Sequence, residues 1–230
     1  MAKPFITEEC LSLFHSLFKE GTFSDEEKIL LNTNRTEVFF KKNEIITKQG
    51  SLAKQLIFIQ KGITKSFFEF GDTRQTICLH PEHSLLGIQG LANANIYHCT
   101  ITALEEVNAC MFNMNTIKQI ANNNPAFSLQ LLDINIEMQS ASIDRIFSLK
   151  LKSDISKLAD ILHCLTTRVY KSDIFDFKFS IEEIAHLSDV PAEIVQKIWR
   201  QFESDKIIEF TDGKIKILNK EQLVYISAIT

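Results

Sequence analysis

The sequence has few of the features that would place a protein in a membrane or in a secretory pathway. No apolar run approaches the roughly 20 residues that a membrane-spanning helix needs, because charged residues interrupt every such run. The first residues, MAKPFITEECLSLFHSLFKEG, lack both a long apolar core and a small-residue cleavage site. We therefore expect no secretory signal, no membrane association and a cytoplasmic location.

Cysteine and histidine are also sparse, and neither forms a recognisable motif. The five cysteines are scattered at positions 10, 78, 99, 110 and 164, without the short spacing of a metal knuckle. We expect them to be buried thiols, as in a reducing compartment. His80, His83 and His98 could converge with Glu82 on a metal or haem, but scattered histidines are the simpler interpretation. We predict no cofactor and no metal.

The chain lacks an excess of positive charge as well. Its formal net charge is −4, and residues 150–230 hold 12 Lys and Arg against 13 Asp and Glu. Affinity for DNA depends strongly on neutralising phosphates, so a DNA-binding protein of this composition must gather its cations on one face. Catalytic motifs are missing too: we find no nucleophile–base pair, phosphate-cradling glycine loop or nucleotide fingerprint, and expect no enzyme.

Residues 181–200, IEEIAHLSDVPAEIVQKIWR, have the apolar spacing of a helix-turn-helix. The small Ala185 would let the second helix cross close to the first. Asp189 stands where this turn often has glycine, and aspartate tolerates a left-handed backbone better than most residues. The same spacing also fits an ordinary αα-corner in a protein core.

The segment that follows favours the DNA-binding interpretation. IIEFTDGKIKIL has two β-branched runs around Asp212-Gly213, a strong hairpin signal that would complete a winged helix. Its recognition helix, near residues 191–203, would lie in the major groove. The alternative for its polar side chains is a solvated helix face. The predicted DNA-contacting residues are Glu193, Gln196, Lys197, Arg200, Lys214 and Lys216, with Lys206 extending the basic patch.

Residues 36–115 consist of short apolar or alternating runs separated by polar turn residues. Many short strands at this spacing are typical of a β-barrel, roll or sandwich. Residues 84–96 break the alternation and are expected to contain a helical turn. The preceding residues, 1–35, are expected to be helical.

Pro125 opens a long helix with two apolar edges. Along the first edge the spacing alternates between four and three residues, the coiled-coil period, over Phe127, Leu131, Ile134, Met138 and Ala141. We assign this edge to a homodimer interface, which leaves the second edge for the chain's own β-domain. The second edge holds Leu132, Ile136, Ile143, Ile146 and Phe147. An ordinary core helix with a broad apolar face is the alternative.

Together these segments predict an α+β chain of three parts. Residues 1–124 would form a double-stranded β-helix (jelly-roll-like) sensor domain with flanking helices, residues 125–148 a central dimerisation helix, and residues 149–230 a winged helix-turn-helix domain. Within the last part, residues 153–167 and 219–228 are expected to form further helices.

This order resembles the Crp/Fnr family of bacterial transcription regulators, from about Val38 to Leu218. The residues that carry the resemblance are EIITKQGSLAKQLIFIQKGITK and FSIEEIAHLSDVPAEIVQKIWRQFESDKIIEFTDGKIKIL. The resemblance implies a cyclic-nucleotide-binding-like β-roll, a dimerising central helix and a winged helix. It therefore implies a homodimer that reads a roughly palindromic site on double-stranded DNA, with one half-site per recognition helix.

The family's recognition helix commonly carries Arg-Glu near its start and a second Arg four residues after the Glu. Here Glu193 matches the Glu, whereas Ala192 takes the first Arg position and Lys197 the second. Glu193 could accept a hydrogen bond from a cytosine amine, and Lys197 could donate to a guanine or a phosphate. Gln196 could pair with adenine in the same groove. The missing first Arg leaves the target sequence open.

The resemblance also locates an effector pocket, which departs further from the family. Members that bind cyclic nucleotides hold the phosphate with a Gly-Glu pair and an Arg-Ser or Arg-Thr pair, but residues 84–104 of this chain contain no Lys or Arg. A buried phosphate without a cation is strongly disfavoured, so we predict that the pocket does not take cyclic nucleotides. The residues assigned to it are Leu85, Leu86, Gly87, Tyr97 and His98.

The sequence therefore predicts a cytoplasmic, homodimeric, DNA-binding transcription regulator with an unidentified small-molecule effector or none. Two alternatives stay open. One is a protein-interaction module that kept the fold without DNA binding, which the balanced charge of residues 150–230 favours. The other is a metal- or haem-binding sensor that uses the histidines.

Overall fold

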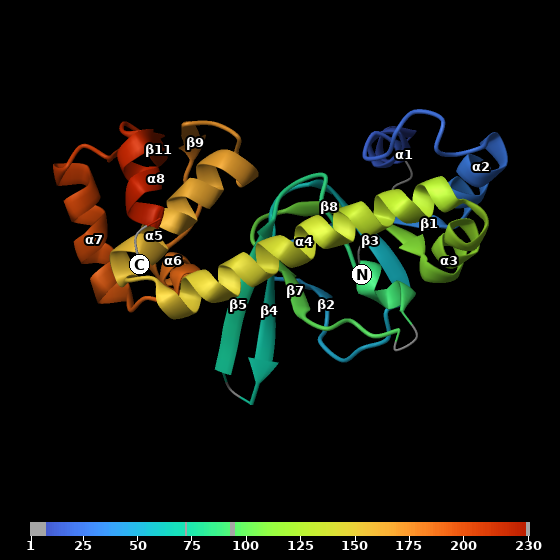
Figure 1. Ribbon diagram of the computed structural model, residues 1–230, viewed down its shortest axis with the longest axis horizontal. Helices are drawn as coiled ribbons and strands as arrows, with labels where there is room; N and C mark the ends of the chain where they lie inside the picture. Colours follow the sequence, from blue (N-terminus) through green and yellow to red (C-terminus); the bar gives the residue numbers. More distant parts are fainter. Residues whose placement is uncertain (1–7, 72, 93–94, 229–230) are drawn as a thin grey trace. The chain divides into compact units, whose positions relative to one another are not determined.

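The computed structural model describes residues 8–71, 73–92 and 95–228. Its contacts divide the chain into two compact units, and the main division falls within the long helix α4 (Pro125–Leu151) (Figure 1). The first unit comprises residues 1–74 and 78–141, and the second comprises residues 75–77 and 142–230. α4 therefore contributes its first part to one unit and its last part to the other.

The first unit is built from two four-stranded sheets with the orders β1-β8-β3-β6 and β2-β7-β4-β5. The strands of these sheets are β1 (Arg35–Phe40), β2 (Ile45–Thr47), β3 (Gln55–Lys61), β4 (Thr64–Phe70), β5 (Thr73–His80), β6 (Leu85–Leu86), β7 (Thr100–Ala103) and β8 (Val107–Asn113). Only residues 75–77 of β5 are grouped with the second unit. The other elements of the first unit are α1 (Glu8–His15), α2 (Asp25–Thr33), the 3₁₀ turn η1 (Ile88–Leu91), α3 (Met114–Asn123) and the first part of α4. The β-roll predicted for the N-terminal part of the chain is confirmed.

The central strands β3 and β8 of the first sheet bury side chains on both faces. Successive side chains of a strand point to opposite faces, so each strand contributes to two clusters. In the register of β3 and β8, Phe58 lies opposite Cys110 and Ile57 lies opposite Met111. Phe58 and Cys110 pack into a cluster with the helices. Ile57 and Met111 pack into a second cluster that includes Ile101 from the other sheet. The helices therefore cover one face of the first sheet, and the second sheet covers the other.

An aromatic cluster attaches the N-terminal helices to the first sheet and to α4. The ring of Phe14, on α1, lies 4.3 Å from that of Phe112 on β8. Phe18 and Phe23 lie 5.1 and 5.0 Å from Phe127, near the start of α4. Aromatic rings at such distances contribute both buried area and favourable ring geometry, so α1, the sheet and the start of α4 share one core.

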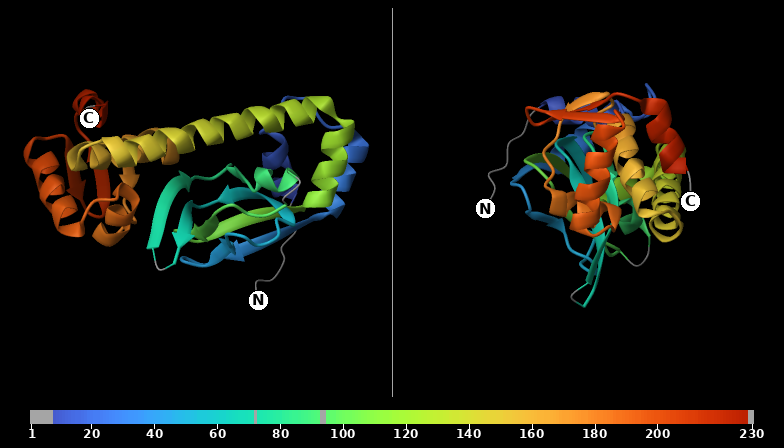
Figure 2. Two further views of the ribbon diagram at one scale, coloured as in Figure 1. Left: turned by 60° about the horizontal axis from the view of Figure 1, so that its bottom comes forward. Right: turned by 90° about the vertical axis from the view of Figure 1, so that its left-hand side faces the viewer.

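The second unit packs helices around a three-stranded sheet of order β10-β11-β9 (Figure 2). Besides the last part of α4, its helices are α5 (Asp154–Cys164), the π-helical turn η2 (Leu165–Val169), α6 (Ile181–Ser188), α7 (Ala192–Ser204) and α8 (Lys220–Ala228). Its strands are β9 (Ile174–Asp176), β10 (Ile208–Thr211) and β11 (Lys214–Ile217). The predicted winged helix-turn-helix fold is confirmed.

In the part of the chain that the structure describes, no helix combines the length and the apolar character that crossing a bilayer requires.

Candidate nucleic-acid interface

α6 and α7 are joined by a tight turn at Asp189. α6 begins with a capping box, in which Ser180 Oγ accepts from the Glu183 N–H (3.1 Å) and Glu183 Oε2 accepts from the Ser180 N–H (2.8 Å). Asp189 ends α6 in the left-handed conformation, with φ 54° and ψ 46°. The N–H of Val190 then donates to the Ala185 oxygen (3.2 Å). The turn that the sequence predicts therefore forms with aspartate in the place of glycine.

α7 has one buried and one exposed face. Val195, Ile198 and Phe202 are buried in the core of the second unit. The four polar residues assigned to DNA contact on this helix, Glu193, Gln196, Lys197 and Arg200, are all exposed. Their spacing of three and four residues places them on one helix face. The structure thus brings these side chains together on the surface.

The hairpin of β10 and β11 supplies the wing. Asp212 and Gly213 form its turn, both with positive φ (53° and 75°), as the primed turns of tight hairpins require. Lys214 and Lys216 are exposed on β11, while Ile215 between them is fully buried. Lys214 Nζ lies 3.8 Å from the Asp176 carboxylate, so part of the wing's positive charge is already paired.

The third strand of this sheet, β9, was not predicted. It pairs with β11 so that Phe175 lies opposite Ile215 and Asp176 opposite Lys214. The sequence of this segment does contain a strand signal, because phenylalanine alternates with polar residues at positions 175, 177 and 179. Phe177 and Phe210 both pack against Trp199 on α7, with ring centroids at 5.1 and 6.3 Å. The sheet therefore supports the buried side of α7.

The residues assigned to an effector pocket separate into three environments. Leu86 and Tyr97 belong to the cluster between the two sheets, whereas Leu85 belongs to the cluster under the helices. Gly87 (φ 84°) lies against Tyr97, whose ring would be 3.0 Å from an added Cβ. His98 is exposed, which places it outside the roll. Leu85 points away from the roll interior because neighbouring residues of a strand face opposite sides, whereas His98 lies in a bend before β7.

A polar group missing from the prediction lies beside this interior. His80 Nε2, on β5, lies 2.9 Å from Ser66 Oγ on β4. Burial and, to a lesser extent, the nearby Cys78 raise the pKa of the Cys99 thiol to about 11, against a lowering hydrogen bond with Ser66. Cys99 is therefore a neutral thiol at physiological pH. The pattern of alternate positions 64, 66, 78 and 80 on predicted strands could have identified this group.

His80, His83 and His98 do not lie together as the ligands of a metal or haem would. His83 and His98 are exposed, and His80 is bonded to Ser66. In the part of the chain that the structure describes, the only cluster of at least three potential metal-ligating side chains of this kind contains Cys10, Glu37 and Cys110.

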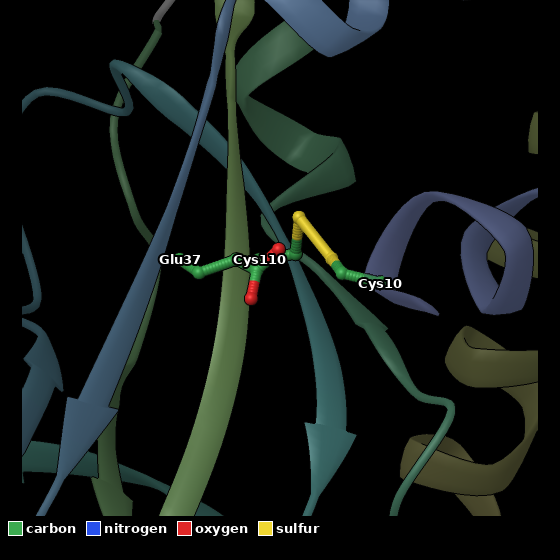
Figure 3. Close-up of side chains that lie close together, drawn as sticks. All are labelled: Cys10, Glu37 and Cys110. Atoms are coloured by element: carbon green, nitrogen blue, oxygen red, sulfur yellow. A yellow bond between two sulfur atoms is a disulfide. The ribbon is translucent and has the colours of Figure 1, made fainter. Parts of the chain in front are cut away.

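Within that cluster, Cys10 and Cys110 are joined in a disulfide (Figure 3). The prediction of buried free thiols is therefore wrong for this pair. The reason is tertiary, because docking of α1 on the sheet brings together residues 100 positions apart. Cys78, Cys99 and Cys164 lie outside this disulfide and are half-buried.

The edge of α4 that was assigned to a partner faces the chain's own core. Phe127 and Leu131 are buried in the cluster under the helices, and Ile134 and Met138 pack against it. Ala141 is half-buried. The second apolar edge is the exposed one: Leu132, Ile136, Ile143, Ile146 and Phe147 are 51, 52, 52, 48 and 58% exposed. The edge predicted to meet a partner is therefore the one that packs on the chain's own core, and the edge predicted to pack on the chain is the exposed one.

Each of the two units matches a known family of protein domains. Residues 37–124 match a model of the cyclic nucleotide-binding domain, and residues 156–226 match a model of the Crp-like helix-turn-helix domain. The transcriptional activator protein FnrA of Stutzerimonas stutzeri is 21% identical over 184 residues, which are 78% of this chain and 75% of the relative.

Solved structures share the fold at low sequence identity. FixK2 from Bradyrhizobium japonicum superposes with a TM-score of 0.78 at 17% identity, covering 85% of this chain and 98% of the other. A mutant of CooA from Carboxydothermus hydrogenoformans gives 0.71 at 16% identity, covering 98% of both chains. With a cyclic nucleotide-binding-like roll, a Crp-like helix-turn-helix and relatives of this kind, the chain belongs to the Crp/Fnr family of transcription regulators.

Proposed function

We propose that the chain acts as a homodimer that reads double-stranded DNA in the cytoplasm, with α7 in the major groove. Crp/Fnr proteins are transcription regulators and not enzymes, in agreement with the prediction from sequence. The observation that carries the proposal is the polar face of α7, where Glu193, Gln196, Lys197 and Arg200 are exposed above a buried apolar face. A core αα-corner would have no reason to keep this surface uncovered.

Cations around α7 would supply the phosphate contacts. Lys214 and Lys216 are exposed on the wing, and Lys206 is exposed just after α7. Because residues 150–230 have slightly more acidic than basic residues, each protomer has few phosphate contacts to offer. Two protomers on one duplex would double that number, which makes dimerisation a requirement for useful affinity.

The exposed edge of α4 is the surface that we propose for the dimer. Leu132, Ile136, Ile143 and Phe147 recur at spacings of four and seven residues, so they form a stripe along one side of the helix. About half of each side chain is exposed in the single chain. Pairing of this stripe with its copy would remove apolar surface from water at about 25 cal/mol for each Å².

For the effector, we propose a ligand other than a cyclic nucleotide. Residues 84–104, which include the stretch equivalent to the family's phosphate-binding segment, contain no Lys or Arg. The polar groups described beside the interior are Ser66, His80 and the Cys99 thiol, and none of them is a lysine or an arginine. Transfer of a phosphodiester into such surroundings would be costly without a cation to pair with it.

Substitution of Lys197 tests the assignment of α7. A duplex is first selected from a randomised library with the wild-type protein, and the affinity of Lys197→Ala for it is measured by gel shift. We expect a loss of about 5- to 100-fold, because one specific base contact is worth roughly 1–3 kcal/mol. Lys61→Ala, which removes an exposed lysine from the first unit, should bind as the wild type does. Equal binding by both variants would refute the assignment.

The balanced charge of residues 150–230 favours one second candidate, a protein-interaction module without DNA binding. The two functions differ in their dependence on salt. A DNA-binding dimer should lose affinity steeply as salt rises, with a log–log slope that counts its phosphate contacts. If the library selection yields no duplex and added DNA shows no salt-dependent binding, the interaction module is the better account.

A further inference from the structure

The disulfide between Cys10 and Cys110 lies in the first unit, whereas the residues assigned to DNA contact belong to the second. Cys10 comes from α1, and Cys110 comes from β8, a central strand of its sheet (Figure 3). Both side chains are fully buried, and their Cα atoms are 6.5 Å apart. Glu37 on β1 lies opposite Cys110 in the strand register. A covalent bond thus attaches a short helix to the middle of a sheet.

We propose that Cys10 and Cys110 form a reversible redox site, and that its oxidation state controls how firmly α1 is held against the sheet and the start of α4. The proposal rests on the proposed function in one respect. A DNA-binding regulator works in a reducing compartment, where disulfides are usually transient or redox-sensing rather than structural.

The reaction is exchange with a dithiol. Because both sulfurs are buried, exchange takes place when α1 opens locally: one thiolate of the reductant then attacks the Cys10 sulfur, which breaks the bond to Cys110 and forms a mixed disulfide. Cys110 leaves as a thiolate and takes up a proton. The second thiol of the reductant then displaces Cys10, which also ends as a thiol. Two electrons and two protons pass from the dithiol to the protein, the reductant becomes a disulfide, and a disulfide oxidant reverses the reaction.

A buried cation favours Cys110 as the leaving group. Arg35 Nη1 lies 3.8 Å from Cys110 Sγ, and only 2% of its side chain is exposed. The same nitrogen is paired with Glu37 Oε1 at 2.5 Å, which holds the guanidinium in place. A thiolate beside a guanidinium is stabilised, and a sulfur with a more stable thiolate leaves faster in exchange.

Arg35 also argues against a metal ion in this cluster. Ligand atoms of Cys10, Glu37 and Cys110 all lie within 4.8 Å of one another, which would suit a cation by distance alone. A metal ion would have to break the pair between Glu37 and Arg35 and leave a buried guanidinium without its counter-charge. Breaking a buried ion pair in this way is strongly unfavourable. The chemistry that fits all four side chains is therefore the disulfide.

Contacts lead from the disulfide to the start of α4. Phe14, one turn after Cys10 on α1, packs on Phe112 with ring centroids 4.3 Å apart. Phe14 also lies 5.1 Å from Phe18, which in turn lies 5.1 Å from Phe127. Loss of the covalent link leaves α1 held only by non-covalent contacts, of which these aromatic ones are part. Reduction should therefore increase local opening of α1 and of the segment of α4 that contains Phe127.

Thiol counting on the full chain tests the chemistry. The protein is equilibrated with oxidised or reduced dithiothreitol, denatured, alkylated and weighed. We expect three alkylated cysteines after oxidation and five after reduction, with peptide mass spectrometry identifying the Cys10–Cys110 pair. Five alkylated cysteines after oxidation, or a different pair, would overturn the proposal. So would one equivalent of metal in the reduced protein that is absent from Cys10→Ser.

Hydrogen exchange tests the structural consequence. Amides of residues 8–15 and 126–131 should exchange about tenfold faster after reduction, as expected for easier local opening. Cys10→Ser should exchange at the fast rate in both conditions, and Cys10→Ala provides the same comparison with an apolar side chain. Cys164→Ser, in the second unit, should respond as the wild type does. Identical exchange in both redox states would contradict the proposal.

Neither thiol counting nor hydrogen exchange uses DNA, so the redox site and the proposed DNA binding are tested independently of each other. Absence of DNA binding counts against the proposed function alone. An unchanged thiol count or unchanged exchange counts against the redox site alone.

Discussion

Single polar side chains set the ends of the helices that form the DNA-facing surface. Ser180 and Glu183 satisfy two backbone N–H groups at the start of α6, and Asp189 accepts the left-handed backbone that ends it. These residues make α7 begin at a fixed place relative to α6. The outward position of Glu193 and Lys197 therefore depends on residues that do not themselves contact DNA in our proposal.

Removal of the cap at α6 should destabilise the second unit. Ser180→Ala deletes the oxygen that accepts from the Glu183 N–H, and such caps contribute about 1 kcal/mol. We expect a drop of that size in the free energy of unfolding measured with urea. Ser180→Asp retains an acceptor at this position and should lie close to the wild type. If Ser180→Ala leaves the free energy of unfolding unchanged, the capping box contributes nothing to stability.

A carboxylate in the β-roll should make stability depend on pH. Hydrogen bonds from Lys48 and Thr100 lower the pKa of Glu69 below its ordinary 4.5. The ionised form is therefore favoured by folding, so its contribution is present above pH 4.5 and is lost as the pH falls through the lower folded pKa. Glu69→Gln should lower the urea midpoint at pH 7, and this effect should be smaller at about pH 3, below the ordinary pKa of the group. An equal effect at both pH values would contradict this cause.

At the scale of helices and strands, local signals predicted much of the fold and tertiary contacts decided the rest. The helix-turn-helix and the hairpin at Asp212-Gly213 were predictable because caps, turns and periodicity act over a few residues. The two edges of α4 were not distinguishable, since both are apolar at similar spacing and only packing on Phe18 and Phe23 selects Phe127. The pairing of Cys10 with Cys110 is likewise set by docking of distant segments.

Charge on the exposed edge of α4 should prevent dimerisation without unfolding the chain. Ile136 is 52% exposed, so the carboxylate of Ile136→Asp would remain in contact with water in the single protomer. In the proposed dimer, the two copies would bring like charges together in the interface. We expect a monomer by sedimentation velocity with an almost unchanged circular dichroism spectrum.

Phe127→Ala is the matched control on the same helix. Phe127 is fully buried, so this variant should remain dimeric and lose about 3–5 kcal/mol of stability. If Ile136→Asp remains a dimer, the exposed edge is not the interface.

At the scale of the whole molecule, one prediction combines the two surfaces. A dimer formed along α4 would carry two copies of α7, and a two-fold symmetric protein reads two half-sites of related sequence. Helix-turn-helix dimers place these half-sites about one helical turn of DNA apart, or a multiple of it. The modest number of exposed cations on one protomer then suffices, because both protomers neutralise phosphates of the same duplex.

Footprinting on the selected duplex, with the mass of the complex measured in parallel, tests this claim most directly. The account predicts two chains per duplex and two protected half-sites in successive major grooves, about 10 base pairs apart. It also predicts that Lys197→Ala weakens protection at both half-sites equally. A single chain on the duplex, or a protected region that Lys197→Ala leaves unchanged, would contradict it.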